Sequence, residues 1–113
     1  MPATLGYTGH VNVSGKVTIA VGIPPVPESS VSNCRNELVT MSVVHNESLA
    51  VFESHSVRTN IHGNYAWNKS IVLPEDPSNY HVRIQVRNMV KTAPLDVPSI
   101  VDFLIIIQPT GGL

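Results

Sequence analysis

The clearest feature of the sequence is an alternation of hydrophobic and polar residues in its first quarter. Valine or isoleucine occupies positions 11, 13, 17, 19 and 21, with mainly polar or small residues between them. A period of two places alternate side chains on opposite faces of a β-strand. Residues 11–21 are therefore predicted to form a strand with one buried and one solvated face.

Five further segments have strand patterns and are bounded by turn residues. Residues 80–87 alternate almost as regularly as the first segment, and residues 100–108 are apolar on both faces. Two β-branched runs flank the polar residues 45–48, which are typical of a hairpin turn. The predicted strands lie near residues 11–21, 38–44, 49–57, 65–73, 80–87 and 100–108.

These strands predict an all-β protein, because no segment combines helical periodicity with capping residues. Short strands separated by turns over about 100 residues are typical of an immunoglobulin-like or transthyretin-like antiparallel β-sandwich of six to seven strands. A small barrel is the alternative. We expect one domain over residues 1–113, in which the long connections 22–36 and 88–99 cross between sheets or form functional loops.

Composition narrows the classes of function. The 113 residues are 42% hydrophobic and 13% charged, with a net charge of −1, so no basic field favours nucleic acid or anionic lipid. The longest apolar run, residues 103–107, is far shorter than the roughly 20 residues of a membrane-spanning helix. The first residues do not resemble a signal peptide, yet a leader removed before Pro2 leaves secretion open.

Common catalytic motifs are missing from the sequence, which therefore predicts a non-enzymatic protein without a cofactor. The five histidines have no chelating spacing, so a metal site would have to be assembled by the fold. His55 and His81, on predicted strand faces, are the candidate ligands of this alternative, a small metal-binding sandwich. Cys34 is either a bystander thiol or the partner in an intermolecular disulfide.

Three Asn-x-Ser sequons are candidate glycosylation sites: Asn12, Asn46 and Asn68. Asn12 falls on the predicted solvated face of its strand, Asn46 in a turn, and Asn68 opposite the two aromatic residues of its strand. Glycosylation requires exposure, which all three positions are expected to have. The sequons favour a secreted or cell-surface glycoprotein in an extracellular or cell-envelope location.

Three groups of side chains are candidates for binding. Tyr65 and Trp67 share one strand face, where they form either a core plug or a sugar-stacking platform, so a lectin-like domain is another alternative. Arg83 and Arg87 belong to a polar strand face that would accept an acidic partner. The second apolar face of the last strand, with Leu104 and Ile106, must be covered by the rest of the fold or by another chain.

Several short strings carry a family resemblance: residues 14–18, 23–25, 38–44, 73–74 and 80–84. Their order resembles the small β-sandwich of YscW-type bacterial lipoproteins and, more loosely, macroglobulin-like and transthyretin-like modules. The resemblance implies an envelope or extracellular sandwich with a chaperone, scaffold or binding role. Together with the residue patterns, it predicts an interaction or structural module that associates with itself or joins a larger assembly.

Overall fold

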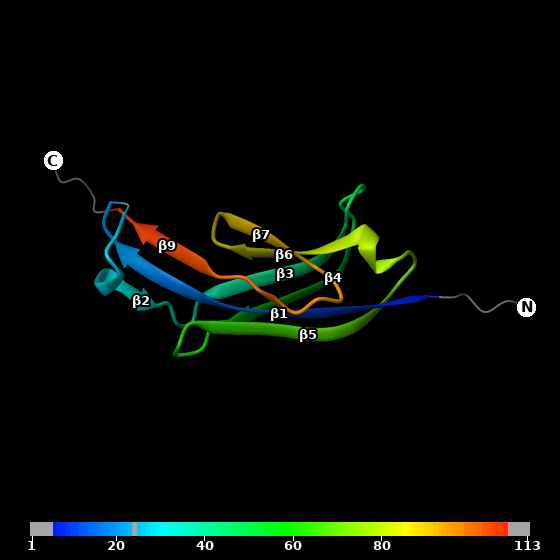
Figure 1. Cartoon of the computed structure of the whole chain (residues 1–113), viewed down its shortest axis with the longest axis horizontal. Coiled ribbons are helices and arrows are strands. Elements are labelled where there is room, and N and C mark those ends of the chain that lie inside the picture. Colours follow the sequence, from blue (N-terminus) through cyan, green and yellow to red (C-terminus); the bar gives the residue numbers. More distant parts are fainter. Residues whose placement is uncertain (1–5, 24, 109–113) are drawn as a thin grey trace, which may run out of the picture.

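The computed structural model describes residues 6–23 and 25–108, which form two β-sheets with two short 3-10 turns (Figure 1). The prediction of an all-β protein is confirmed. The first sheet contains β1 (Tyr7–Val21), β2 (Val31–Asn33), β5 (Asn64–Leu73), β8 (Ser99–Ile100) and β9 (Phe103–Ile107). The second has the order β4 (Val51–Arg58), β3 (Leu38–His45), β6 (Tyr80–Val86) and β7 (Met89–Pro94). The 3-10 turns are η1 (Glu28–Ser30) and η2 (Pro77–Asn79).

The long strand β1 organises the first sheet. It pairs antiparallel with β5 over residues 7–16 and with β2 over residues 18–20. Both β8 and β9 pair with β1 in the parallel direction. The predicted antiparallel pairing therefore holds for most strand pairs but not for the last segment, which returns alongside β1 in the same direction instead of forming a hairpin.

The carboxyl-terminal segment keeps a single register along β1. Val13 lies opposite Ser99 and Val17 opposite Phe103, an offset of 86 residues in both cases (99 − 13 and 103 − 17). Outside these two ladders, aspartate side chains accept backbone N–H groups of β1 at the same offset of 86. Asp96 accepts the N–H of His10 at 2.8 Å, and Asp102 accepts the N–H of Lys16 at 2.9 Å.

A glycine permits the close approach of this segment. A Cβ atom on Gly15 would lie 1.8 Å from the backbone oxygen of Val101 and 2.7 Å from the Tyr65 hydroxyl, so no side chain fits there. The Tyr65 hydroxyl donates a hydrogen bond to that same Val101 oxygen. Gly15, Tyr65 and Val101 thus fasten β5, β1 and the final segment at one point.

One hydrophobic core lies between the two sheets. It follows from the predicted alternation: Val11, Val13 and Val17 of β1 are at most 1% exposed, and Val82, Ile84 and Val86 of β6 are fully buried. The side chains of Met41, Trp67 and Phe103 fill the space between the sheets. Burial of this apolar surface is the main stabilising contribution of the fold.

The structure also corrects several predicted boundaries. β1 begins at Tyr7, before the alternation starts, and the last predicted strand is divided into β8 and β9. The connections 22–36 and 88–99 contain β2 and β7 instead of being simple crossings or loops. Both are edge strands and are largely exposed, so they lack the hydrophobic alternation of core strands.

Candidate interaction surface on the carboxyl-terminal strand

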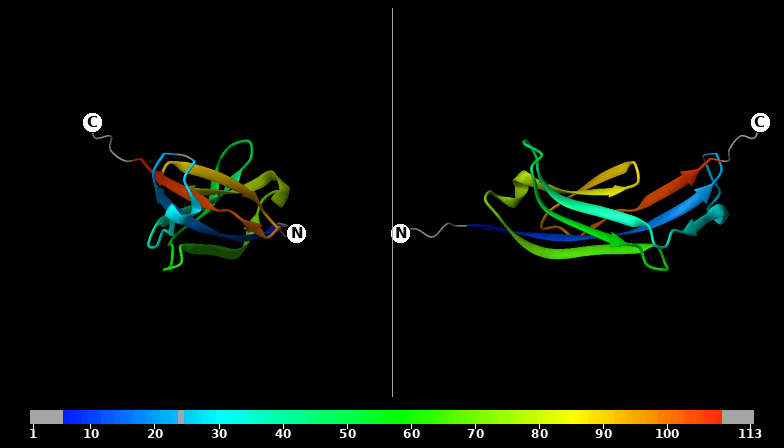
Figure 2. Two further views of the ribbon diagram at one scale, coloured as in Figure 1. Left: turned by 60° about the vertical axis from the view of Figure 1, so that its left-hand side comes forward. Right: turned by 180° about the vertical axis from the view of Figure 1, so that it is seen from behind.

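β9 is an apolar strand at the edge of the first sheet. Its residues are Phe103-Leu104-Ile105-Ile106-Ile107, with no polar or charged side chain. Phe103 and Ile105 point into the core, whereas Leu104 is 38% exposed and Ile107 is 42% exposed. In residues 6–23 and 25–108, β9 has a ladder with β1 only, and Figures 1 and 2 show it at the outside of the sheet. Its second edge is therefore unpaired.

Further exposed apolar residues surround this strand. Val21 is 61% exposed at the end of β1, opposite Ile107, and Ile23 follows it at 73%. Ile100 of β8 is 79% exposed. The alternation placed Val21 on a buried face, which was wrong, because β1 extends beyond the region that the second sheet covers. The sequence signal that could have identified this region is the scarcity of charged residues between positions 17 and 27.

Only the beginning of β9 is protected by the second sheet. The Lys91 amino group donates to the backbone oxygen of Asp102 at 2.6 Å and lies 5.2 Å from the centre of the Phe103 ring. Asp102 is exposed and makes the backbone contact with Lys16 described above. Its charge within an apolar segment therefore has a structural role in joining the segment to β1. In the described residues, Leu104 and Ile107 have no such contact and stay partly exposed.

Of the two interpretations of Tyr65 and Trp67, the structure favours the core plug over the sugar platform, because both residues belong to the core. Tyr65 is 4% exposed and Trp67 is 6% exposed. The ring of His55 stacks on Trp67 with 5.4 Å between ring centres and an interplanar angle of 19°, so the histidine covers the indole. A sugar ring needs an open aromatic face, and neither residue offers one.

The structure does not bring the two candidate metal ligands together. His55 pairs with the buried Met41 and lies on the inner side of β4. His81 lies between the buried Tyr80 and Val82 and therefore points from the other face of the sheet. Its Nδ1 atom is 2.7 Å from Oδ1 of Asn46. Within the described residues, no three histidine, cysteine or acidic side chains gather as a metal site would require.

Cys34 is poorly placed for an intermolecular disulfide. Its side chain is buried and donates to Oε1 of Glu37 at a sulfur–oxygen distance of 3.6 Å. Burial, together with the negative charge of Glu37, raises the pKa of the thiol. Because thiolate is the reactive form, the structure favours the bystander thiol. Glu37 also forms an ion pair with Arg87 at 3.1 Å.

The two candidate arginines on β6 therefore differ. Arg87 is held by Glu37 and has a positive φ of 54°, so its role is to close the hairpin that follows β6. Arg83 is exposed on the outer face of the second sheet, between Ser42 and Thr92 on the neighbouring strands. In the described residues its guanidinium has only a long contact of 3.5 Å with Gln85.

A polar pocket of about 150 Å³ lies beside the turn between β3 and β4. It is lined by His45, Asn46, Glu47, Glu75 and Asn79. Ser48, His45 and Glu75 superficially form a nucleophile, a base and a carboxylate. Nδ1 of His45 is 3.2 Å from the Ser48 hydroxyl, and Nε2 is 3.3 Å from Oε2 of Glu75. However, Nδ1 also accepts the backbone N–H groups of Glu47 and Ser48, so its lone pair stabilises the turn.

The three sequon asparagines lie in different environments. Asn68 is exposed on β5, and Oδ1 is 2.8 Å from Nε2 of His10. Asn12 is half-buried and lies directly opposite Asn68 on β1. Asn46 is exposed, but both polar atoms of its side-chain amide have partners: Nδ2 donates to the backbone oxygen of Ser78, and Oδ1 contacts Nδ1 of His81. Asn68 therefore has the most accessible amide nitrogen of the three.

Comparison with known proteins bears on the fold. No family model and no curated protein matches the chain. A solved structure that is similar is the major plantain pollen allergen Pla l 1, with a TM-score of 0.53 and 10% sequence identity. The alignment covers 89% of this chain and 94% of the allergen chain. At this identity the similarity concerns the fold alone, and the resemblance to YscW-type and macroglobulin-like modules stays a prediction.

Proposed function

We propose that this protein is a non-enzymatic interaction module that associates with itself through β9. The supporting observation is the unpaired edge of β9, which consists of five apolar residues and leaves Leu104 and Ile107 partly exposed. Unpaired N–H and C=O groups on an edge strand are a template for pairing with another chain. Natural proteins protect such edges with charge, proline or bulges, and β9 has none of these.

A second copy is the partner that suits this strand. Two β9 strands related by a two-fold axis through Ile105 pair antiparallel, with Phe103 opposite Ile107 and Leu104 opposite Ile106. Every side chain then meets another apolar side chain, and the first sheet continues across both copies. Such an interface is isologous and closes as a dimer.

The proposed module is an extracellular β-sandwich. Two sheets enclosing one core support an immunoglobulin-like or transthyretin-like sandwich. The exposed sequon at Asn68 supports an extracellular glycoprotein. The described residues contain no helix long and apolar enough to span a membrane. An interaction or structural role in the extracellular space is consistent with these features.

Sedimentation velocity over a dilution series tests the proposal. We expect the wild-type protein to form a dimer whose fraction rises with concentration, and Leu104→Lys to weaken the dimer at least about tenfold, because a charge would be placed in the joined sheet. Val72→Lys is the matched control, since Val72 is a 75% exposed apolar residue on β5, away from β9. Equal association of wild type and Leu104→Lys would contradict the proposal, as would a wild type that stays monomeric.

A further inference from the structure

The two ends of the molecule carry charges of opposite sign. One end consists of the β3–β4 turn, residues 45–50, and the neighbouring segment 74–79. The other consists of the loop 33–37 and residues 58–63, which are the last residue of β4 and the turn after it. Figures 1 and 2 show these two pairs of segments at opposite ends of the sheets. Each pair is held together by backbone hydrogen bonds, between Asn46 and Asn79 at one end and between Asn36 and Thr59 at the other.

The first of these surfaces, the acidic end, contains Glu47, Glu75 and Asp76. All three are exposed, and neither segment contains lysine or arginine; the nearest basic side chain is His45, whose Nε2 lies 3.3 Å from Oε2 of Glu75. Hydrogen bonds from Ser78 lower the pKa of Asp76, which keeps its carboxylate charged. Leu49 is 65% exposed at the tip of the same turn, where its positive φ of 61° fixes the local backbone. The acidic end thus combines several negative charges with one protruding apolar side chain.

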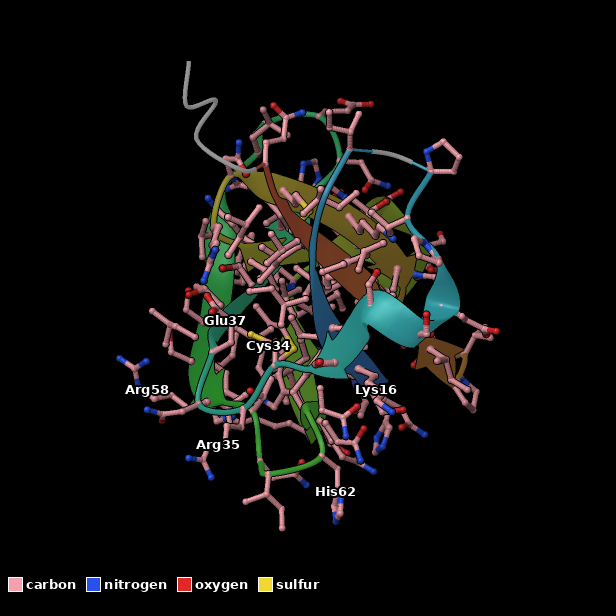
Figure 3. All side chains as sticks on the ribbon, turned by 90° about the vertical axis from the view of Figure 1, so that its left-hand side faces the viewer. Lys16, Cys34, Arg35, Glu37, Arg58 and His62 are labelled. Carbon is pink, nitrogen blue, oxygen red and sulfur yellow. The ribbon has the colours of Figure 1, made fainter. Side chains whose placement is uncertain are left out.

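The second surface, the basic end, contains Arg35, Arg58 and His62. Figure 3 shows these side chains projecting outward around this end of the molecule, whereas Glu37 points inward beside Cys34. Ile61 is 69% exposed at the tip of the turn. Because Arg87 pairs with Glu37, the nearby carboxylate is already neutralised. The described residues place no carboxylate in an ion pair with Arg35 or Arg58.

The architecture separates the two surfaces. β4 runs from one to the other with eight residues, Val51 to Arg58, which span roughly 23 Å at 3.3 Å per residue. Charges at this distance are screened from each other at physiological salt, where the Debye length is about 8 Å. The acidic end therefore cannot neutralise the basic end of its own molecule.

We infer that the basic end of one copy binds the acidic end of another. Arg35 and Arg58 then face Glu47, Glu75 and Asp76, and the apolar tips Ile61 and Leu49 are shielded in the same contact. Complementary charge favours this orientation over contacts between like ends. The contact joins two different surfaces, so it is heterologous and extends head to tail into a row of molecules.

This contact uses none of the residues of β9, so it goes beyond the dimer proposed above and can be tested separately. The test starts from a Leu104→Lys background, in which pairing of β9 is blocked. Sedimentation of this protein at about 20 mM salt should show association that weakens at least about tenfold at about 500 mM salt. A monomer at all concentrations in low salt would overturn the inference whether or not β9 pairs.

Two variants in this background then identify the surfaces. Arg35→Glu with Arg58→Glu disables the basic end, and Glu47→Lys with Asp76→Lys disables the acidic end. Each variant still presents one intact surface, but its two ends now carry charge of the same sign, so each alone should remain monomeric. A mixture of the two should associate, because the intact acidic end of one variant meets the intact basic end of the other.

The charge reversals provide their own control. If the reversed ends attract each other in the mixture, chains longer than dimers form. These chains should disappear when alanine replaces the reversed residues, in one variant with Arg35→Ala and Arg58→Ala and in the other with Glu47→Ala and Asp76→Ala. A one-to-one dimer with these alanine variants supports the inference. The absence of a heterodimer in the alanine mixture would overturn the inference. It would also be overturned if each alanine variant alone associated as strongly as the parent protein, because a different surface would then cause the salt-sensitive association.

Discussion

The two open sides of this molecule are built differently. On one side, the unpaired edges of β4 and β5 face each other, and side chains close the gap: Glu53 pairs with Lys69 at 2.7 Å, and His55 stacks on Trp67. On the other side, β9 offers an unpaired edge of five apolar residues. Charge and a register irregularity protect the first side, whereas in the described residues the second has only Lys91, at the beginning of β9.

This difference separates an edge suited to solvent from one suited to a partner. The irregularity between Val43 and Val44 leaves Phe52 outside the register of β4, which disturbs its outer edge, and Glu53 and Lys69 add charge beside it. A strand approaching β4 would have to bury these groups. A strand approaching β9 would bury only leucine and isoleucine. The same fold therefore discourages association on one side and favours it on the other.

The largest expected effect concerns the core beneath the protected side. Trp67→Ala should lower the free energy of unfolding by about 3–5 kcal/mol, because it empties a buried site between the sheets. His55→Ala, which removes only the covering ring, should cost less than about 1 kcal/mol. Urea unfolding of both variants measures the difference. Similar losses for the two variants would show that the indole does not fill the space between the edges of β4 and β5.

A smaller effect is expected when the protection itself is removed. Glu53→Val combined with Lys69→Val deletes both members of the exposed ion pair, so no unpaired charge remains and stability should change by less than about 1 kcal/mol. The protein should nevertheless begin to associate at roughly tenfold lower concentration, because the β4–β5 side becomes apolar. Static light scattering in the Leu104→Lys background measures this. Unchanged scattering would mean that charge does not protect this edge.

The smallest expected effect concerns the point where the final segment is fastened. Tyr65→Phe should cost about 1 kcal/mol at neutral pH, through loss of the hydrogen bond to Val101. Burial, and then the negative charge of Asp102, raise the pKa of Tyr65 in the folded state. The contribution of this pKa difference to the free energy of unfolding is fully present below the ordinary tyrosine pKa of about 10 and is lost as pH rises above it.

The melting temperature between pH 8 and 11 tests this sign. Tyr65→Phe should lose less stability than wild type over this range, because it has one fewer group that ionises only on unfolding. Part of the slope should persist, since burial also raises the pKa of Tyr80 and of Cys34. Identical pH profiles would mean that Tyr65 ionises as readily in the folded protein as in the unfolded chain.

The alternation of side chains predicted much of the fold but little of its pairing. Val11, Val13 and Val17 were placed correctly because the period of two alone decides which face is buried. The parallel return along β1 depends on Asp96 and Asp102, which bind residues 86 positions away in the sequence, and on Gly15, where the neighbouring chain leaves no room for a side chain. No local pattern encodes such distant contacts, so an antiparallel arrangement was expected instead.

The candidate site was predicted in part for the same reason. The two apolar faces of residues 100–108 indicated an extra surface to cover, and Leu104 is partly exposed. The exposure of Val21 and Ile23 was missed, because it depends on where the second sheet ends. Tyr65 and Trp67 share a face as predicted, but only the position of β4 and His55 decides that this face is closed.

Concentration-dependent hydrogen exchange of β9 tests the central proposal most directly. Those amides of residues 103–107 that do not donate to β1 are open to solvent in a single copy. If β9 pairs with β9 of a second copy, their exchange should slow by about tenfold or more as the protein is concentrated into the dimer range. Exchange of these amides that stays equally fast in dilute and concentrated samples would contradict the proposal.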